Sequence, residues 1–218
     1  MTFWEITSEL LGGFAYTLLI FGVTLAAAIP LGLLVAFGSM SRFKPLKYLV
    51  KSFVWVIRGT PLMLQIIIFA LGPGLWLGIP IRTISEQLLM VCIAFSINYA
   101  CYFSEIFRGG IESISKGQHE AGQVLGMTRW QVFRHVILLQ VVKRVIPPMS
   151  NEVITLVKDT ALASVIVHVD LFTIAKQIVN TEVILWPLFY SAVYYLLFTA
   201  LLTFLFGLCE KKLSYFKA

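Results

Sequence analysis

The sequence predicts an all-helical protein that crosses a membrane several times. Hydrophobic residues make up 59% of the chain and charged residues only 13%, whereas soluble domains carry about 25% charged residues. A chain with so few charges cannot cover its own surface in water, so its solvent is a lipid bilayer. The alternating pattern of a membrane β-barrel is absent, and the runs rich in Leu and Ala favour helices, whose backbone groups are satisfied within the segment.

Five stretches are long and apolar enough to cross the hydrocarbon core, which takes about 20 residues of helix. We predict one domain over residues 1–218, with five transmembrane helices at the following approximate positions: 14–40, 61–79, 87–107, 151–167 and 186–208. The first contains Pro30, which predicts a tilt or a kink. It also carries Ala28, Gly32 and Ala36 at intervals of four, a small-residue face that fits packing within the chain as well as a subunit contact.

The second stretch carries two groups of helix-breaking residues. Gly59 and Pro61 mark its start, because proline suits the first turn of a helix. Gly72–Gly74 predict that this segment is short or interrupted, and broken helices at membrane depth occur where the backbone lines a cavity or is buried in protein. The alternative is a helix that simply ends at the outer interface near Trp76.

Basic residues predict the orientation, because cytoplasmic loops carry an excess of Lys and Arg. Of the 17 Lys and Arg residues, 14 follow the first, third and fifth stretches. Only Arg82 and Lys176 lie in the other connections, and Lys158 lies inside the fourth stretch. We therefore expect the amino terminus outside, and the segment 116–148 and the carboxyl terminus in the cytoplasm. The division of the charge among three loops argues against nucleic-acid binding.

Several polar residues lie inside the predicted membrane segments, where they are costly and usually face a protein interior or an aqueous path. Glu152, Thr155 and Asp159 share one helical face by their spacing, with Lys158 about 100° away. Pairing across helices and lining a transport path both fit these charges. The candidate path residues are Thr60, Gln65, Asn98, Glu105, Glu152, Lys158, Asp159 and Thr160.

The basic segment 116–148 is too long for a simple connection. We predict a first helix over 116–125, ended by Gly126, because glycine readily adopts the left-handed cap conformation. Thr128 followed by Gln131 matches a capping box and starts a second helix, which the two prolines at the end of the segment are expected to stop. The result is a helix–turn–helix elbow. Its basic residues would also suit a site on anionic lipid heads.

The stretch EAGQVLGMTRWQVFRHVILL in this elbow resembles the cytoplasmic EAA loop of the membrane subunits (permeases) of bacterial ABC importers. That pattern is Glu-Ala-Ala, three residues, Gly, nine residues and Ile-x-Leu-Pro. Gly122 replaces the second alanine, and Leu139 replaces the proline. Four residues match the pattern in register: Glu120, Ala121, Gly126 and Leu138. Val136 is a conservative replacement of the isoleucine.

Three further stretches narrow the resemblance. RGTPLMLQ (58–65), FRGGIESISKGQHEAG (107–122) and NEVITLVKDTALASVI (151–166) are similar, in the same order, to stretches of the polar amino acid permeases in this family. The likeness covers about residues 14–212. It implies a type I ABC importer transmembrane domain that crosses the bacterial plasma membrane several times and translocates polar amino acids.

The resemblance also implies partners. A second permease subunit, identical or paralogous, would pair with this chain, two ATP-binding cassette ATPase subunits would dock inside, and an extracytoplasmic amino-acid-binding protein would deliver the substrate. The chain has no Gly-x-x-x-x-Gly-Lys-Ser/Thr loop, so we expect no bound cofactor and no enzymatic activity, with ATP and Mg on the separate ATPase. The 116–128 elbow would couple to that ATPase through Glu120, Ala121, Gly122, Gly126 and Met127.

The charges in the membrane segments leave the substrate open. Carboxylates such as Glu105, Glu152 or Asp159 would suit a cationic amino acid, and Lys158 would suit an acidic one. An ABC permease for another small solute is the nearest alternative, and a channel or scaffold subunit without ATP coupling is a more distant one.

An intramembrane serine hydrolase is the alternative from a different class. Ser164 and His168 are four residues apart and would share a helical face. An activated serine also needs an oriented base and oxyanion donors, however, and no Gly-x-Ser-x-Gly motif is present. The three cysteines are widely spaced and form no metal or redox pattern, so we expect no metal site.

Overall fold

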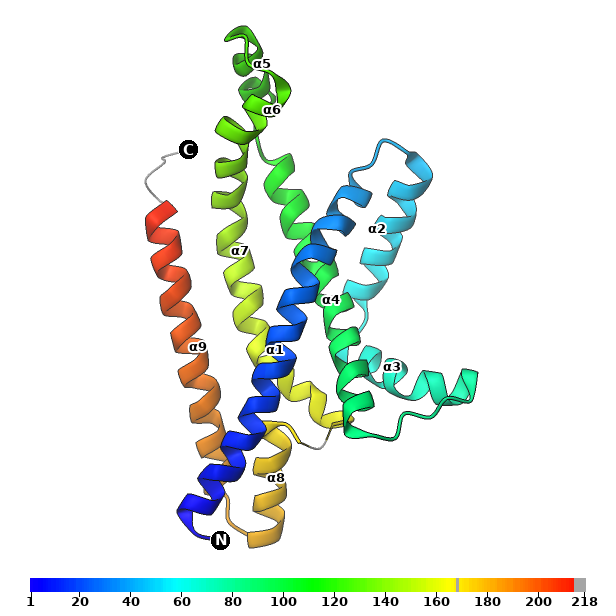
Figure 1. The fold of residues 1–218 in the computed structure, drawn as a ribbon, viewed down its shortest axis with the longest axis vertical. Coiled ribbons are helices and arrows are strands. Elements are labelled where there is room, and N and C mark those ends of the chain that lie inside the picture. Colours follow the sequence, from blue (N-terminus) through cyan, green and yellow to red (C-terminus); the bar gives the residue numbers. More distant parts are fainter. Residues whose placement is uncertain (168, 214–218) are drawn as a thin grey trace.

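A computed structural model describes residues 1–167 and 169–213, and within these ranges all regular structure is helical. Long helices run beside one another, and two short ones, α5 (Lys116–Val124) and α6 (Arg129–Val132), protrude at one end of the molecule (Figure 1). The amino terminus lies at the opposite end. The predicted all-helical class is confirmed.

α1 (Phe3–Ser39) begins earlier than the first predicted membrane segment. Thr2 and Glu5 form a capping box, in which the Thr2 backbone N–H donates to the Glu5 carboxylate at 2.7 Å and the Glu5 N–H donates to the Thr2 hydroxyl at 3.3 Å. These bonds satisfy two of the donors that a helix start leaves free. The helix therefore begins at Phe3 instead of near residue 14.

α1 packs closely along α4 (Ile84–Glu112), which lies at the centre of the bundle. A Cβ added to Gly32 would lie 2.9 Å from the Ala100 carbonyl oxygen, so only glycine permits this approach. Because Ala28 and Ala36 are also fully buried, the predicted small-residue face serves packing within the chain.

The second predicted segment is bent at its start. α2 (Lys44–Gly59) and α3 (Leu62–Leu77) meet at an angle of 103°, and Figure 1 shows α2 running along the bundle while α3 lies across it. Thr60 and Pro61 between them have extended backbones. The residue before a proline is steered away from the helical conformation, so α2 ends there.

The predicted interruption of the second segment at Gly72–Gly74 is wrong, whereas the alternative, a short helix that ends near Trp76, is observed. α3 continues through these glycines for 16 residues in all and is capped by Gly78, whose φ is 68°. The glycine at position 72 serves packing instead, because a Cβ added there would lie 3.0 Å from the Trp76 ring. The predicted segment 61–79 is therefore the second half of a bent pair.

The predicted stop at Pro147–Pro148 is also wrong. The chain continues from α6 through a π-helical turn at Phe133–Ile137 into α7 (Leu138–Asp159), which contains both prolines and ends in the 3₁₀ turn Thr160–Val165. A proline inside a helix costs about 3 kcal/mol, but α7 is packed against both α4 and α9 (Trp186–Leu213). The predicted segment 151–167 thus covers only the second half of this helix and its final turn.

Three described helices, α1, α4 and α9, are each long and apolar enough to cross a membrane, and the bent pair α2–α3 adds a fourth if it counts as one crossing. α7 carries more charged side chains than these helices do. The structure therefore agrees with a membrane protein that has several spans.

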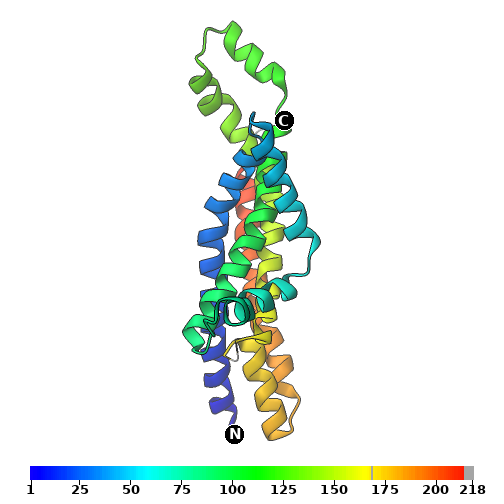
Figure 2. The ribbon, with the colours of Figure 1, turned by 90° about the vertical axis from the view of Figure 1, so that its right-hand side faces the viewer.

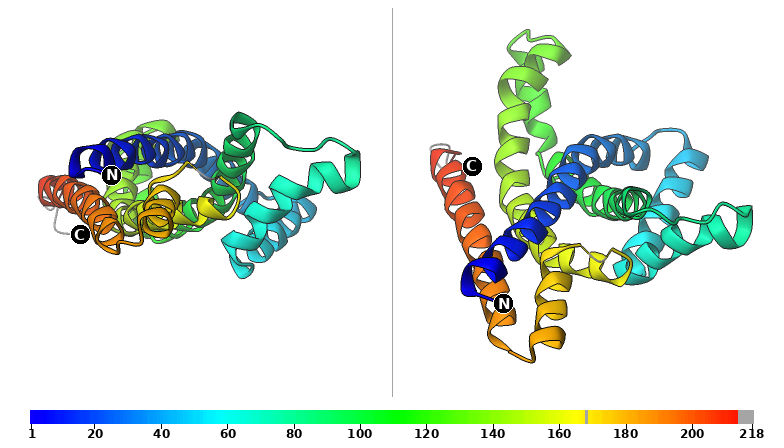
Figure 3. Two further views of the ribbon diagram at one scale, coloured as in Figure 1. Left: turned by 90° about the horizontal axis from the view of Figure 1, so that it is seen from below. Right: turned by 60° about the horizontal axis from the view of Figure 1, so that its bottom comes forward.

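The hydrophobic core surrounds α4, where Phe95, Tyr99 and Phe103 are almost completely buried. The bundle is narrower in the view turned by 90° (Figure 2). Seen from below, α9 and the α2–α3 pair lie at opposite edges (Figure 3). The short helix α8 (Leu171–Glu182) packs against α1 and α9 near the amino-terminal end.

Candidate functional site

A cavity of about 460 Å³ lies where the break between α2 and α3 faces α4 and α7. Its volume falls in the range of small-molecule sites, roughly 300–1,000 Å³. Eight of its eleven lining residues carry a polar or charged side chain, which is unusual for surfaces between membrane helices. The lining consists of Arg58, Gly59, Thr60, Pro61, Leu62, Asn98, Tyr99, Tyr102, Glu152, Thr155 and Asp159.

Gln65 holds the break that forms one wall of this cavity. Its amide nitrogen lies within hydrogen-bonding distance of three acceptors: the Ile57 carbonyl (2.8 Å), the Thr60 carbonyl (3.2 Å) and the Thr60 hydroxyl (2.8 Å). The last carbonyls of a helix have no hydrogen-bond donor within that helix. The Gln65 side chain supplies such a donor to Ile57, in the last turn of α2. Its amide oxygen accepts a hydrogen bond from the Asn98 side chain at 3.0 Å, which ties the break to α4.

The acidic wall of the cavity comes from α7. Asp159 accepts a hydrogen bond of 2.7 Å from the Tyr99 hydroxyl, and the buried Tyr99 ring stacks on Phe95. The Asp159 carboxylate is therefore held in one position by a rigid neighbour. Glu152 and Thr155 line the cavity from the same helix, so the shared face predicted from their spacing is observed.

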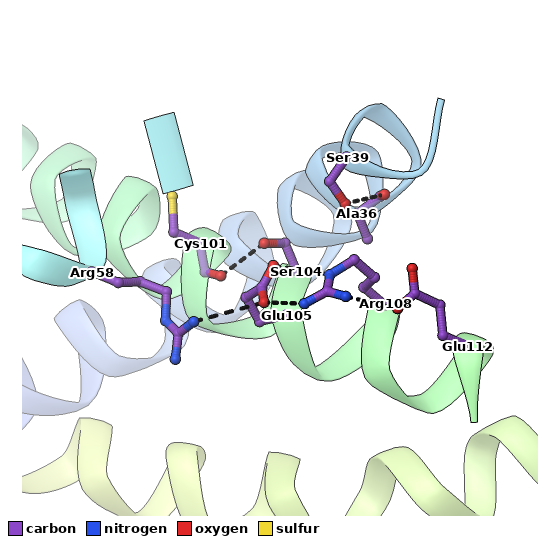
Figure 4. Close-up of polar contacts among 8 residues, drawn as sticks. All are labelled: Ala36, Ser39, Arg58, Cys101, Ser104, Glu105, Arg108 and Glu112. Carbon is purple, nitrogen blue, oxygen red and sulfur yellow. Dashed lines mark hydrogen bonds and ion pairs between the residues drawn. The ribbon is translucent and has the colours of Figure 1, made fainter. Parts of the chain in front are cut away.

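Arg58 carries the only positive charge among the described residues that line the cavity. Its guanidinium lies 5.0 Å from the centre of the Tyr102 ring, and its Nη1 atom lies 3.8 Å from Oε2 of Glu105. Glu105 is held mainly by Arg108, through contacts of 3.1 and 2.5 Å, and Arg108 also contacts Glu112 at 2.7 Å. Figure 4 shows this row of charges running from Arg58 along α4.

The structure separates the eight predicted path residues into two groups. Four of them line the cavity: Thr60, Asn98, Glu152 and Asp159. Gln65 lies directly behind the lining and is hydrogen-bonded to Thr60 and Asn98. The other three lie off the lining. Lys158 is exposed on another face of α7, Thr160 is fully buried with its hydroxyl donating to the Val157 carbonyl, and Glu105 belongs to the row of charges on α4.

Three polar residues of this lining were not among the predicted path residues. Arg58 counted toward the predicted orientation and opened the stretch RGTPLMLQ, and Tyr99 and Tyr102 were not singled out. A signal existed, because Tyr102 lies four residues after Asn98 and therefore on the same helical face. The side of α4 that bears Asn98 could thus have been read as one polar surface.

The elbow has the predicted local structure. Gly126 has a φ of 72°, and the N–H groups of Gly126 and Met127 donate at 3.0 Å to the carbonyls of Gln123 and Gly122. These bonds close the end of α5. The capping box of Thr128 that starts α6 is present as well.

The departure of Gly122 from the EAA pattern has a structural reason. A Cβ added at Gly122 would lie 2.4 Å from a methyl carbon of Val132, which fills the space that the alanine of the pattern would take. Val132 is buried with Ile114 and Ile137 in a small core cluster, against which Met127 packs. α5 and α6 are therefore held together by their own apolar contact.

The tip of the elbow exposes an apolar patch. Val124 is 87% exposed, Leu125 78% and Trp130 65%, and the Trp130 ring stacks on Phe133 with their centres 5.6 Å apart. Large apolar patches exposed on a protein mark interaction sites with other proteins or with a membrane. Glu120 and Ala121 are also exposed, on the preceding helix α5.

A polar cavity between helices of a membrane protein is typical of substrate pathways, and here it is combined with a protruding helical elbow. The chain belongs to the family of binding-protein-dependent transport system inner membrane components, whose model matches residues 28–215. The family and its motifs make the chain a permease subunit of an ABC importer rather than an enzyme.

Individual relatives agree with this assignment. The chain is 37% identical to the L-cystine transport system permease protein TcyB of Bacillus subtilis, over 100% of this chain and 90% of that protein. It is 35% identical to the arginine transport system permease protein ArtQ of Bacillus subtilis, over 94% and 92%. The predicted resemblance to amino-acid permeases is confirmed.

Solved structures agree as well. A crystal structure of an amino acid ABC transporter with histidines covers 95% of each chain with a TM-score of 0.85 and 31% identity. The MetNI methionine ABC transporter in an inward-facing conformation matches with a TM-score of 0.70 at 16% identity, which concerns the fold alone. The hydrolase alternative gains nothing here: Ser164 is half-buried in a 3₁₀ turn, and His168 lies outside the described residues.

Proposed function

We propose that this chain is one of two permease subunits of an ABC importer for polar amino acids in the bacterial plasma membrane, and that its cavity is part of the substrate path. The cavity itself carries the proposal, because α2–α3, α4 and α7 all bring polar side chains to it. Such groups are costly in lipid and mark substrate pathways when they face a common space. The relatives named for L-cystine and arginine transport support the substrate class.

The charges of the lining favour a cationic or zwitterionic amino acid over an acidic one. Two carboxylates, Glu152 and Asp159, face one guanidinium, that of Arg58. Lys158, which would have suited an acidic substrate, is exposed outside the cavity. An ammonium group would lie near the two carboxylates, and a carboxylate would lie near Arg58.

Uptake of labelled amino acids by the reconstituted assembly tests this function. Vesicles would contain this chain, its partner permease if there is one, the ATPase and the binding protein. We expect ATP-dependent uptake of arginine, histidine, glutamine or cystine in preference to glutamate. Uptake that proceeds without ATP would favour a channel, and ATP-dependent uptake of a different solute would refute the substrate class.

The coupling to ATP would run through the elbow. Because the sequence has no phosphate-binding loop of its own, ATP and Mg would be bound by two separate ATPase subunits, and an extracytoplasmic binding protein would deliver the substrate. Glu120 and Ala121 would contact the ATPase together with the exposed patch. Gly122, Gly126 and Met127 would keep the turn in shape, so that closure of the ATPases moves the helices as rigid bodies.

We also propose five crossings: α1, the bent pair α2–α3, α4, α7 and α9. The elbow and the last residues of α9, which include Lys211 and Lys212, lie at the same end of the molecule (Figure 1). The amino terminus lies at the other end. The excess of basic residues at the elbow end supports a cytoplasmic elbow and an external amino terminus.

Cysteine accessibility tests this orientation. Ser8→Cys and Gln118→Cys would be made singly in a chain whose three native cysteines are replaced, since both positions are exposed on opposite ends of the molecule. An impermeant thiol reagent added to right-side-out vesicles is expected to label position 8 and not position 118. Labelling of position 118 alone would invert the topology, and labelling of both would place an even number of crossings between them.

A further inference from the structure

We propose that Arg58 is a substrate-sensitive latch between α2 and α4. Glu105 holds the Arg58 guanidinium while the cavity is empty, and the α-carboxylate of an amino acid in the cavity takes it over. This inference rests on the proposed role of the cavity as the substrate path, and it adds a response of the protein to substrate.

The contact between Arg58 and Glu105 is the weak one in the row of charges. The two atoms are 3.8 Å apart, and the side chains are 41% and 24% exposed. A contact of this length is longer than a charge-assisted hydrogen bond and contributes little. A competing carboxylate can therefore displace Glu105 from Arg58 at a small cost.

Glu105 does not depend on Arg58 for its own charge. Arg108 contacts both of its carboxylate oxygens, at 3.1 and 2.5 Å, from one turn further along the same helix (Figure 4). Release of Arg58 thus leaves no isolated carboxylate on α4. The strong pair lies within α4 and the weak pair joins it to α2, which is the arrangement that a latch needs.

Arg58 is also the residue that a carboxylate entering the cavity would find. It is the only cationic group among the described residues of the lining. A guanidinium binds a carboxylate through two parallel hydrogen bonds. Glu152 and Asp159 on the α7 wall would repel the carboxylate of the substrate and so direct it toward Arg58.

Loss of the latch would loosen α2 against α4, because the ties that remain at this end of α2 are the hydrogen bonds of Gln65 and the contact of Arg58 with the Tyr102 ring. Val54 is the only buried residue of α2. α4, in contrast, is central and continues to the base of the elbow, where the Ser113 carbonyl accepts a hydrogen bond from Arg144 of α7. Separation of α2 from α4 at Arg58 therefore changes the support of the helix that leads to the elbow.

Two variants of the latch are expected to have opposite effects on affinity. Binding of labelled L-arginine would be measured by equilibrium dialysis on the purified permease–ATPase assembly without binding protein, together with basal ATP hydrolysis. Glu105→Gln removes the competitor for Arg58, so the Kd should fall about two- to fivefold. Arg58→Gln removes the carboxylate partner, so the Kd should rise about tenfold or more. Both variants open the latch and should raise basal ATP hydrolysis.

Matched controls separate the latch from damage to the fold. Glu112→Gln removes the other partner of Arg108 but does not touch Arg58, so it should leave affinity and basal hydrolysis unchanged. Binding of agmatine, which is arginine without its carboxylate, should be insensitive to Arg58→Gln.

Different results would refute the Arg58 latch and the substrate path. If Glu105→Gln weakens L-arginine binding or leaves both affinity and basal hydrolysis unchanged, the latch is wrong while the path stands. If the wild-type assembly binds none of L-arginine, L-glutamine and L-cystine saturably, the substrate path is wrong and the latch falls with it.

Discussion

The Gly126→Pro variant is expected to insert into the membrane normally and to lose substrate-stimulated ATP hydrolysis almost completely. Gly126 has a φ of 72°, a value that proline, fixed near −65°, cannot adopt. Proline also removes the N–H that donates to the Gln123 carbonyl at 3.0 Å. The turn between α5 and α6 would therefore open, and the exposed patch would no longer be presented in one geometry.

Stimulation of ATP hydrolysis by substrate and binding protein, measured in vesicles that hold the whole assembly, decides this expectation. Gly126→Asn is the matched control, because asparagine tolerates the left-handed conformation and no atom lies within 4 Å of an added Cβ. It should retain most of the stimulation. Full stimulation and uptake in the proline variant would show that the elbow does not couple the two subunits.

The Asp159→Asn variant is expected to lower uptake of cationic amino acids by about ten- to a hundredfold, the range for loss of a charged hydrogen-bond partner. The fold should survive, because the asparagine oxygen can still accept the 2.7 Å hydrogen bond from Tyr99. What is lost is the negative charge on the cavity wall. Neutral amino acids should therefore be affected less than cationic ones.

The measurement is uptake per inserted molecule for arginine, histidine, glutamine and glutamate. Lys158→Gln is the control, since it neutralises the adjacent charge on an exposed face outside the cavity, and it should keep the wild-type preference. An unchanged substrate preference in Asp159→Asn, accompanied by less inserted protein, would assign Asp159 to packing instead of transport.

The turn of the elbow could be predicted almost residue by residue because its structure depends on neighbours in the chain. A helix ended by Gly126 and a capping box at Thr128 are local arrangements, in which each group bonds to another a few residues away. The sequence contained every partner. The replacement of the second alanine by Gly122 could be seen but not explained, because its reason is Val132, which lies across the turn.

The course of the helices through proline and glycine could not be predicted in the same way. Pro147 and Pro148 stop an isolated helix, but α7 is supported by packing against α4 and α9. At Gly59–Pro61 the opposite happened: the chain bends by 103° there, and Gln65 supplies the hydrogen bonds that the bend leaves open. Tertiary contacts decide which breaking signal takes effect.

The cavity was predictable on one wall only. Periodicity along α7 gave the shared face of Glu152, Thr155 and Asp159, because that relation lies within one helix. Which residues face this wall depends on how α2 and α4 are placed beside α7. The opposition of Arg58 to the two carboxylates therefore became visible only in three dimensions.

The central claim, that substrate passes through this cavity, is tested most directly by blocking it. Thr155 lines the cavity and is half-buried, and a Thr155→Cys chain without the native cysteines can be modified there with a bulky thiol reagent in the reconstituted importer. The account predicts that modification abolishes ATP-dependent amino-acid uptake and that saturating substrate slows the modification. Full uptake after complete modification would contradict it.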